Sequence, residues 1–166
     1  MEIRPATIDD AATVRGLAHD AWHETYGEVL DDDTIEETVE EWYADDALAD
    51  ALDRPGTAFL VAEVDGGQAG FCHGVCDGAS GYVLRLYVEP DNQGQGVGTA
   101  LYEHLRDDLR DLNMHRMYAM VLADNDSGNE FYREMGFEKT SEGVVELGGE
   151  RYTENVYKTS LRDPVR

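Results

Sequence analysis

The sequence has few basic residues, few cysteines and no long hydrophobic run. Lysine and arginine together number 13 against 36 aspartates and glutamates, which gives 166 residues a formal charge of −23. DNA, RNA and anionic membranes repel such a chain, so we expect no nucleic-acid or membrane partner. The longest apolar runs are far too short to span a bilayer. The first residues, Met-Glu-Ile-Arg, lack the apolar core of a signal peptide, which favours a soluble, cytoplasmic protein.

The two cysteines, Cys72 and Cys76, lie four residues apart in a segment that reads as a strand. On a strand they would share a face about 13 Å apart, at ~3.3 Å per residue, which is too far for a disulfide. Two thiols alone do not make a metal site either. We therefore expect two buried free thiols and no metal.

The acidic residues are spread through every segment, in clusters such as residues 31–33 and 107–108. Two explanations are open: an acidic shell suited to concentrated salt, or electrostatic capture of a cationic substrate. The even spread favours the shell, and hence a halophilic source. At molar salt the screening length falls to ~3 Å, so the self-repulsion of such a shell largely disappears.

The length suits one domain over residues 1–166, because domains commonly run ~100–200 residues. Hydrophobic periodicity predicts both strands and helices. The expected strands are 2–7, 57–64, 68–76, 81–88, 116–122, 138–147 and 150–161. The expected helices are 11–21, 34–44, 47–52 and 98–112, with a short one that Ser127 caps and Gly136 ends.

Two of these strands carry further expectations. Small residues (Gly70, Gly74 and Cys76) share one face of the strand 68–76, which leaves space for something packed close. In the strand 81–88, simple alternation places Val83, Arg85 and Tyr87 on one side. Tyr82, Leu84, Leu86 and Val88 then lie on the other side.

One stretch, residues 84–101 (LRLYVEPDNQGQGVGTAL), places a strand, a glycine-rich loop and a helix in that order. The β-forming residues stop at Pro90, which cannot donate to a sheet ladder. Bare backbone N–H groups before a helix N-terminus favour an anion, so the loop is predicted to bind a phosphate-bearing ligand. A tight strand-to-helix turn without a ligand is the alternative. The loop lacks the Lys-Ser/Thr pair of a P-loop, and its G-x-G-x-G spacing differs from the dinucleotide fingerprint.

The pattern Gln93-x-x-Gly96-x-Gly98, after a strand that ends Tyr-Val-x-Pro, resembles the acetyl-CoA-binding motif of the GNAT superfamily of N-acetyltransferases. A second segment, from Asn125 to Phe137, resembles that family's N-x-x-[small]-x-x-F-Y-x-x-x-G-F motif. The resemblance spans residues 3–161. It implies the α/β GNAT fold, in which a central mixed, mostly antiparallel twisted sheet carries helices on both faces.

The resemblance also implies site residues. In the family the loop amides hold the CoA pyrophosphate, and the preceding strand pairs with the pantetheine arm. The two central parallel strands splay, which frees a backbone N–H near Val88 to polarise the thioester carbonyl. Tyr132 is expected to protonate the departing thiolate, because a phenol of pKa ~10 suits a thiol of pKa ~8.5. The cofactor-binding residues carried over are Leu86, Tyr87, Val88, Gln93, Gly94, Gln95, Gly96, Val97, Gly98, Thr99, Asn125 and Tyr132, although Asn125 could equally serve as a helix cap.

The reaction implied is direct transfer of an acetyl group from acetyl-CoA to a primary amine, of a small molecule or a peptide N-terminus, in a ternary complex. Neither cysteine has an obvious base partner, which argues against a covalent enzyme intermediate. The alternatives are a catalytically silent acetyl-CoA sensor and a nucleotide-binding domain. The family's usual glutamate base is absent, which leaves Glu63, His73, His23 and Glu24 as substitutes. The identity of the acceptor amine stays open. Whether this chain forms a homodimer, as many relatives do, also stays open.

The acidic shell predicts stability that depends on salt. We expect the melting temperature to rise between dilute buffer and molar KCl, because screening removes repulsion among the carboxylates. Thermal melts followed by circular dichroism across a KCl series measure this. A melting temperature that stays constant or falls would exclude the halophilic interpretation.

Overall fold

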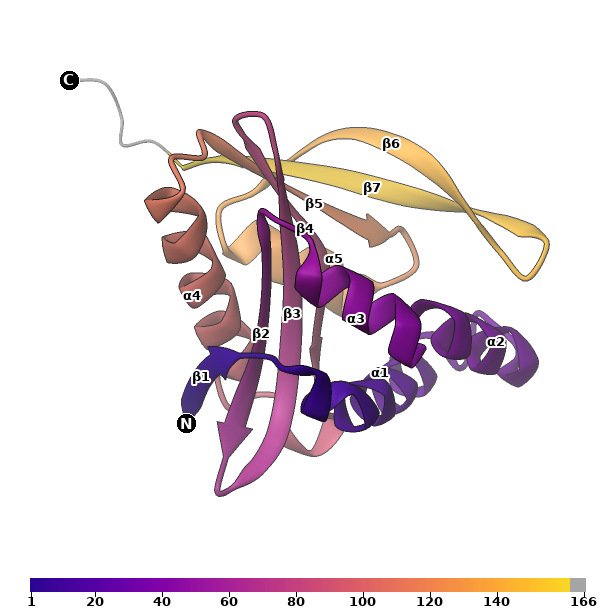
Figure 1. Cartoon of the computed structure of the whole chain (residues 1–166). Coiled ribbons are helices and arrows are strands. Elements are labelled where there is room, and N and C mark those ends of the chain that lie inside the picture. The colour runs from indigo at the N-terminus through magenta and orange to yellow at the C-terminus, as the bar shows by residue number, and fades with distance from the viewer. Residues whose placement is uncertain (162–166) are drawn as a thin grey trace.

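The computed structural model describes residues 1–161, which form a seven-stranded sheet between two groups of helices (Figure 1). Residues 162–166 of the expected domain lie outside the described residues. The strands are β1 (Glu2–Pro5), β2 (Thr57–Val64), β3 (Gly67–Asp77), β4 (Ser80–Val88), β5 (Arg116–Leu122), β6 (Glu138–Leu147) and β7 (Glu150–Ser160). The helices are α1 (Ala11–Tyr26), α2 (Asp32–Trp42), α3 (Asp45–Asp53), α4 (Val97–Asp111) and α5 (Asp126–Glu134), with 3-10 turns η1 (Ile8–Asp10) and η2 (Pro90–Asn92).

The sheet has the order β1-β2-β3-β4-β5-β7-β6, and only β4 and β5 run parallel. The predicted mixed, mostly antiparallel sheet is confirmed. Asp65 and Gly66 join β2 to β3 with φ angles of 53° and 82°, the left-handed pair that a two-residue hairpin turn requires. The helix α4 connects β4 to β5, which makes this connection the crossover that two parallel strands need.

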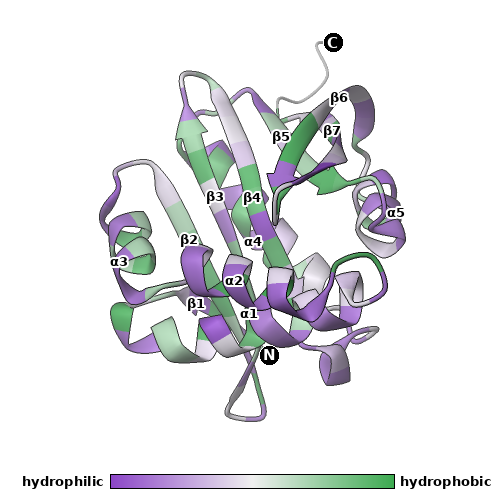
Figure 2. Cartoon of the chain, turned by 90° about the vertical axis from the view of Figure 1, so that its right-hand side faces the viewer, coloured by the Kyte–Doolittle hydropathy of each residue, from purple (hydrophilic) through white to green (hydrophobic). Residues whose placement is uncertain are grey.

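Helices cover both faces of the sheet, as expected. One apolar cluster joins α4 and α5 to the sheet, and a second joins α1, α2 and α3 to its other face. Figure 2 shows hydrophobic residues concentrated on the central strands, while α1 and α2 carry many hydrophilic ones. Within residues 1–161, no helix has the length and apolarity that crossing a bilayer requires.

The small residues of β3 make room for α4. A side chain at Gly74 would come within 2.8 Å of Leu105, and one at Gly70 would come within 3.3 Å of Leu101. Both leucines are fully buried, one helical turn apart on α4. Glycine is therefore needed at these positions because the helix packs directly on the strand backbone. Both thiols are free, as predicted; Cys72 is buried in this same cluster, whereas Cys76 packs against it and is only partly buried.

Two sequence expectations about these elements are wrong. The helix α1 does not end at residue 21 but continues to Tyr26, because Trp22 and Tyr26 extend its buried face by one more turn. The helix α5 is capped by Asn125 rather than by Ser127. The Asn125 Oδ1 atom accepts the Gly128 N–H at 2.9 Å and also the Ser127 hydroxyl at 3.2 Å.

The predicted end of α5 is confirmed. Gly136 has a φ of 95°, the left-handed conformation that favours glycine after a helix. Its N–H donates to the carbonyl of Arg133 at 3.1 Å, and that of Phe137 donates to Tyr132 at 3.0 Å. These two bonds satisfy carbonyls that the helix end would otherwise leave unpaired.

Candidate active site

The parallel strands β4 and β5 separate halfway along their length. Their pairing runs from Ser80 opposite Arg116 to Val83 opposite Ala119, and no further pair joins them in the described chain. β3 and β4, in contrast, stay paired as far as Val88. The remainder of β4 thus borders a gap instead of a neighbouring strand on one edge.

A β-bulge at Leu84 accompanies this separation and corrects the predicted alternation of β4. His73 pairs with Arg85 while Gly74 pairs with Val83, so Leu84 is an extra residue without a pairing partner on β3. Val83 consequently joins Leu86 and Val88 on the α4 side, where it is 1% exposed. A bulge of this kind increases the local twist and re-aims the strand that follows it.

The bulge leaves the Val88 N–H directed towards the gap. The next N–H along the chain, of Glu89 just after β4, donates to the carbonyl of Ala69 in β3 at 2.8 Å. Successive backbone groups of a strand alternate between its two edges, so those of Val88 face the side that β5 has left. The Val88 carbonyl accepts the side chain of Gln93 at 3.3 Å instead of a strand partner.

The gap opens into a cavity of about 470 Å³. Its walls come from β4 and the glycine loop, the start of α4, the end of β5, the first turns of α5, parts of α1 and α2, and the β6–β7 hairpin. Every residue carried over as cofactor-binding lines it except Gln95. These residues are Leu86, Tyr87, Val88, Gln93, Gly94, Gly96, Val97, Gly98, Thr99, Asn125 and Tyr132.

The glycine loop has the backbone geometry of an anion site. Gly94 and Gly96 have φ angles of 80° and 82°, and no atom lies within 4 Å of where a Cβ would be, so conformation alone requires glycine there. Gly96 is the N-cap of α4. The first N–H groups of a helix have no partner within it, and those of α4 belong to residues that line the cavity. Donors and helix dipole together suit a phosphate group.

Tyr132, on α5, lines the cavity together with residues of α1. Its ring packs 5.3 Å from those of Phe131 and Phe137 and 6.1 Å from that of Tyr157, measured between ring centroids. The residue is 7% exposed, and it lines the cavity. Burial raises the pKa of Tyr132 above its ordinary value, which keeps the phenol protonated at neutral pH.

Asn129, which sequence reasoning missed, holds α5 in place. Its side-chain amide donates to the carbonyls of Leu122 and Asn125 at 3.0 and 2.7 Å. Its Oδ1 accepts the Tyr157 hydroxyl at 2.6 Å and the Asn155 amide at 2.8 Å. This buried side chain, 4% exposed, therefore ties the helix of Tyr132 to β5 and β7. Nothing in the local sequence signals the role, because its partners lie up to 28 residues away.

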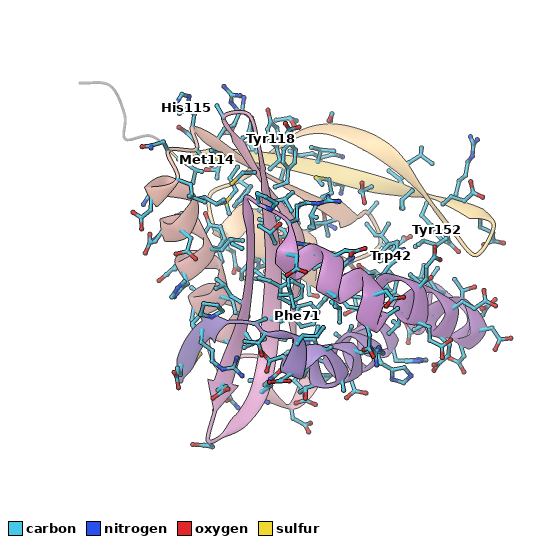
Figure 3. The ribbon with its side chains drawn as sticks, viewed as in Figure 1. Trp42, Phe71, Met114, His115, Tyr118 and Tyr152 are labelled. Carbon is cyan, nitrogen blue, oxygen red and sulfur yellow. The ribbon has the colours of Figure 1, made fainter. Side chains whose placement is uncertain are left out.

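Aromatic side chains form the part of the cavity wall contributed by α1 and α2. The Trp22 ring lies 4.9 Å from Tyr26, 5.4 Å from Trp42 and 6.4 Å from Tyr87, again between centroids. Trp42 packs against the same cluster as Phe71, and Figure 3 shows both side chains on the α1–α3 side of the sheet. The Tyr26 hydroxyl accepts the Asn125 amide at 3.2 Å, which connects this wall to the start of α5.

Comparison with known proteins identifies the family of this chain. A model described as an acetyltransferase (GNAT) domain matches residues 55–139. The chain belongs to the GNAT family of acetyltransferases. It is 30% identical over 151 residues to an aminoglycoside N(6')-acetyltransferase of Stenotrophomonas maltophilia, which covers 86% of this chain and 89% of that protein.

Two further matches come from Thermoplasma acidophilum. Its spermidine N(1)-acetyltransferase is 26% identical over 141 residues, which covers 82% of this chain and 88% of that protein. The crystal structure of its PaiA N-acetyltransferase in complex with coenzyme A has a TM-score of 0.86, with 23% identity, and covers 96% of this chain and 98% of that one. The GNAT fold expected from the motifs is confirmed.

The substitutes named for the missing GNAT base do not lie at the site. None of Glu63, His73, His23 and Glu24 lines the cavity. Glu63 pairs with Arg4 at 2.8 Å, and His23 lies 3.1 Å from Glu36. His73 is 4% exposed and stacks 4.9 Å from the Phe59 ring, and burial lowers its pKa to about 4.

Glu154 of β7, which sequence reasoning also missed, is the one carboxylate among the lining residues that the structure describes. It pairs with Leu122 at the carboxyl end of β5, where β4 has already separated. Burial raises the pKa of Glu154 above its ordinary value. The sequence could not single it out among the chain's many acidic residues, because only the pairing of β7 with β5 brings it to the cavity.

The cysteines are poorly placed for covalent chemistry. Cys72 packs under α4, with its Sγ 3.9 Å from the carbonyl of Leu101, and burial raises its pKa to about 12. Neither Cys72 nor Cys76 lines the cavity. A thiol that stays protonated at neutral pH is a weak nucleophile, so this geometry offers no covalent route through cysteine.

Substituting Gly96 tests whether the glycine loop binds the cofactor. Alanine at a φ of 82° costs about 1–2 kcal/mol, so Gly96→Ala should weaken acetyl-CoA binding by about tenfold in isothermal titration calorimetry. Gly66 in the β2–β3 turn has the same φ of 82° and equally open surroundings, which makes Gly66→Ala the matched control. The control should lower the melting temperature to a similar extent and leave the Kd unchanged. Equal Kd values for both variants would contradict the assignment of the loop.

Proposed function

We propose that this protein transfers the acetyl group of acetyl-CoA directly to a primary amine in a ternary complex. The observation that carries the proposal is the cavity itself, where the glycine loop, the Val88 N–H and Tyr132 meet the aromatic wall and Glu154. The cavity thus offers contacts for two substrates at once. The poorly placed cysteines support a transfer without an acyl-enzyme step.

Acetyl-CoA supplies an activated thioester, and the chain supplies orientation and charge stabilisation. The N–H groups of Val97, Gly98 and Thr99 would hold the pyrophosphate at the start of α4. The Val88 N–H faces the gap, where it would stabilise negative charge that develops on the thioester oxygen. A preorganised donor of this kind contributes ~3 kcal/mol to lowering a barrier.

Tyr132 would donate a proton to the departing thiolate of coenzyme A. Its hydroxyl keeps its proton at neutral pH, because burial raises its pKa. Burial in the same apolar surroundings also raises the pKa of a thiol. The pKa of the phenol that donates the proton and the pKa of the thiol that forms therefore shift in the same direction. The packing of Tyr132 between rings and the anchoring of α5 by Asn129 fix the direction of the phenol.

The acceptor we propose is a small cationic amine. Trp22, Tyr26, Trp42 and Tyr87 offer ring faces that attract a cation, and Glu154 offers a negative charge. Arg85, the one basic residue among the described lining, stacks 4.5 Å above the Tyr43 ring. The β6–β7 turn also packs against α2, where Gly148 meets Thr34, and this closure favours a small molecule over a protein N-terminus. The spermidine and aminoglycoside acetyltransferases among the relatives also act on small amines, by their names.

Glu154 is the base we propose. An amine must lose its positive charge before it attacks a carbonyl, and a carboxylate of raised pKa accepts a proton more readily than an ordinary one. The path from the amine to Glu154 would be direct or through one water molecule.

A panel of acceptors tests the proposed function. Spermidine, an aminoglycoside and a peptide with a free N-terminus are each incubated with acetyl-CoA in molar KCl, and the released CoA thiol is measured. Thiol release should be fastest with a small cationic amine. Acetyl-CoA binding without thiol release on any amine would favour a sensor in place of an enzyme, and release with the peptide alone would exclude a small-molecule acceptor.

Replacing the Tyr132 hydroxyl tests the general acid. Tyr132→Phe should lower kcat by at least about 100-fold, the lower range for a lost proton donor, while the Kd for acetyl-CoA changes little. Tyr102→Phe is the control, because Tyr102 is also buried in this aromatic cluster but does not line the cavity. A kcat of Tyr132→Phe equal to that of the control would remove Tyr132 from the mechanism.

The pH dependence tests Glu154. Only the carboxylate form accepts a proton, so kcat/KM should fall as pH drops through the raised pKa of Glu154. Glu154→Gln should lower kcat/KM by about 100-fold and abolish this fall at acidic pH. The part of the pH profile at higher pH, which comes from protonation of the amine itself, should remain. Glu146→Gln, an exposed glutamate of the same hairpin, serves as the control. A wild-type pH profile in Glu154→Gln would show that the base lies elsewhere.

A further inference from the structure

Two histidines of α1 and a glutamate of α2 converge outside the active-site cavity. His19 and His23 lie one helical turn apart, so they occupy the same face of α1. Their Nε2 atoms lie 2.6 and 3.1 Å from a single oxygen, Oε1 of Glu36. All three ligand atoms lie within 4.8 Å of one another, and none of the three residues lines the cavity.

Each histidine has a second carboxylate behind it. The Nδ1 atom of His19 lies 3.5 Å from Asp20, and that of His23 lies 3.7 Å from Asp32. Histidines that bind a metal commonly direct their other ring nitrogen to a carboxylate, which orients the ring and raises its basicity. Each ring nitrogen of both histidines thus faces a carboxylate oxygen, and the two Nε2 atoms face the same one, Oε1 of Glu36.

Protonation of the two histidines does not by itself balance the charges and hydrogen bonds of this cluster. The two rings are 4.5 Å apart between centroids, so two imidazolium charges would repel each other while sharing one carboxylate oxygen. A single divalent cation would bind the two neutral rings and the carboxylate together. Imidazole nitrogen combined with one carboxylate is a ligand set suited to zinc rather than to magnesium or calcium.

We propose that His19, His23 and Glu36 bind a Zn²⁺ ion that joins α1 to α2. Tetrahedral zinc with bonds of ~2.0–2.1 Å places its ligand atoms about 3.3 Å apart, so the Glu36 oxygen, now 2.6 and 3.1 Å from the ring nitrogens, needs to move by well under an ångström. All three side chains are partly exposed, which gives the ion access and lets the carboxylate rotate. The fourth position would hold water.

The bound ion would stiffen one wall of the active-site cavity. Trp22 and Tyr26 flank His23 on α1, and Trp42 ends α2, so a bridge between these helices fixes the rings that line the cavity. The proposal itself does not depend on the proposed function. Zinc binding is measured directly, without acetyl-CoA or an amine, and its failure would leave the acetyltransferase assignment untouched.

Calorimetric titration of the chelator-treated full chain with ZnCl₂ tests the site. Excess MgCl₂ in the buffer occupies diffuse carboxylate positions of the acidic surface, which would otherwise bind zinc weakly. We expect one zinc per chain, and a melting temperature that rises with zinc concentration. His23→Ala and Glu36→Gln should each weaken zinc binding by at least about tenfold, and Asp32→Asn should weaken it by up to about tenfold.

The matched control is His104→Ala. His104 is an exposed histidine of α4 that lies 3.9 Å from a single carboxylate, Asp108, and no second histidine joins it in the described residues. Its loss should leave zinc binding unchanged. Circular dichroism of each zinc-free variant checks that it folds like the wild type. The proposal is overturned by wild-type affinity in His23→Ala, or by the absence of any saturable zinc binding in the wild type.

Discussion

The separation of β4 from β5 beyond Val83 is the constraint on which the rest of the structure depends. In a continuous sheet the backbone of Val88 would be paired, and no cavity would exist between these strands. The bulge at Leu84 lets β4 remain attached to β3 while it leaves β5. Backbone groups that lack a partner are costly when buried, so the gap is stable only where a side chain such as Gln93, or a ligand, meets them.

The packing beneath the sheet then sets where the helix N-terminus lies. Leu101 and Leu105 fit against the backbone of β3 at Gly70 and Gly74, which fixes α4 closely on the strand. Rigid packing of this kind matters for a site, because donors and reacting groups must be held within fractions of an ångström. Asn129 has the same effect for α5, since its hydrogen bonds to Leu122, Asn155 and Tyr157 join the helix to two strands and thereby place Tyr132.

Charge is distributed unequally between surface and site. The chain carries a formal charge of −23, yet the described lining of the cavity holds one acidic residue, Glu154, and one basic residue, Arg85. The general acidity of the surface is therefore separable from the chemistry of the site. On the outer side of α1 and α2 the same acidity acts locally, where Asp20, Asp32 and Glu36 surround two histidines. There the pKa of His19 is raised by its hydrogen bond to Glu36.

Local features of this sequence could be read from the chain alone. The strand that stops before Pro90, the glycines that adopt left-handed φ angles and the start of α4 all follow from preferences of neighbouring residues. The end of α5 at Gly136 has the same origin. The two family motifs then implied a mixed, mostly antiparallel sheet with helices on both faces, and residues of both motifs line one cavity in the structure.

The tertiary structure alone decided the rest. The bulge at Leu84 depends on the register with β3, and the extension of α1 to Tyr26 depends on the apolar surface that it covers. Glu154 reaches the cavity through the pairing of β7 with β5, and His19, His23 and Glu36 meet through the packing of two helices. The physical reason is common to these cases. Propensities and motifs act over a few residues, whereas burial, pairing and charge depend on which distant segments the fold brings into contact.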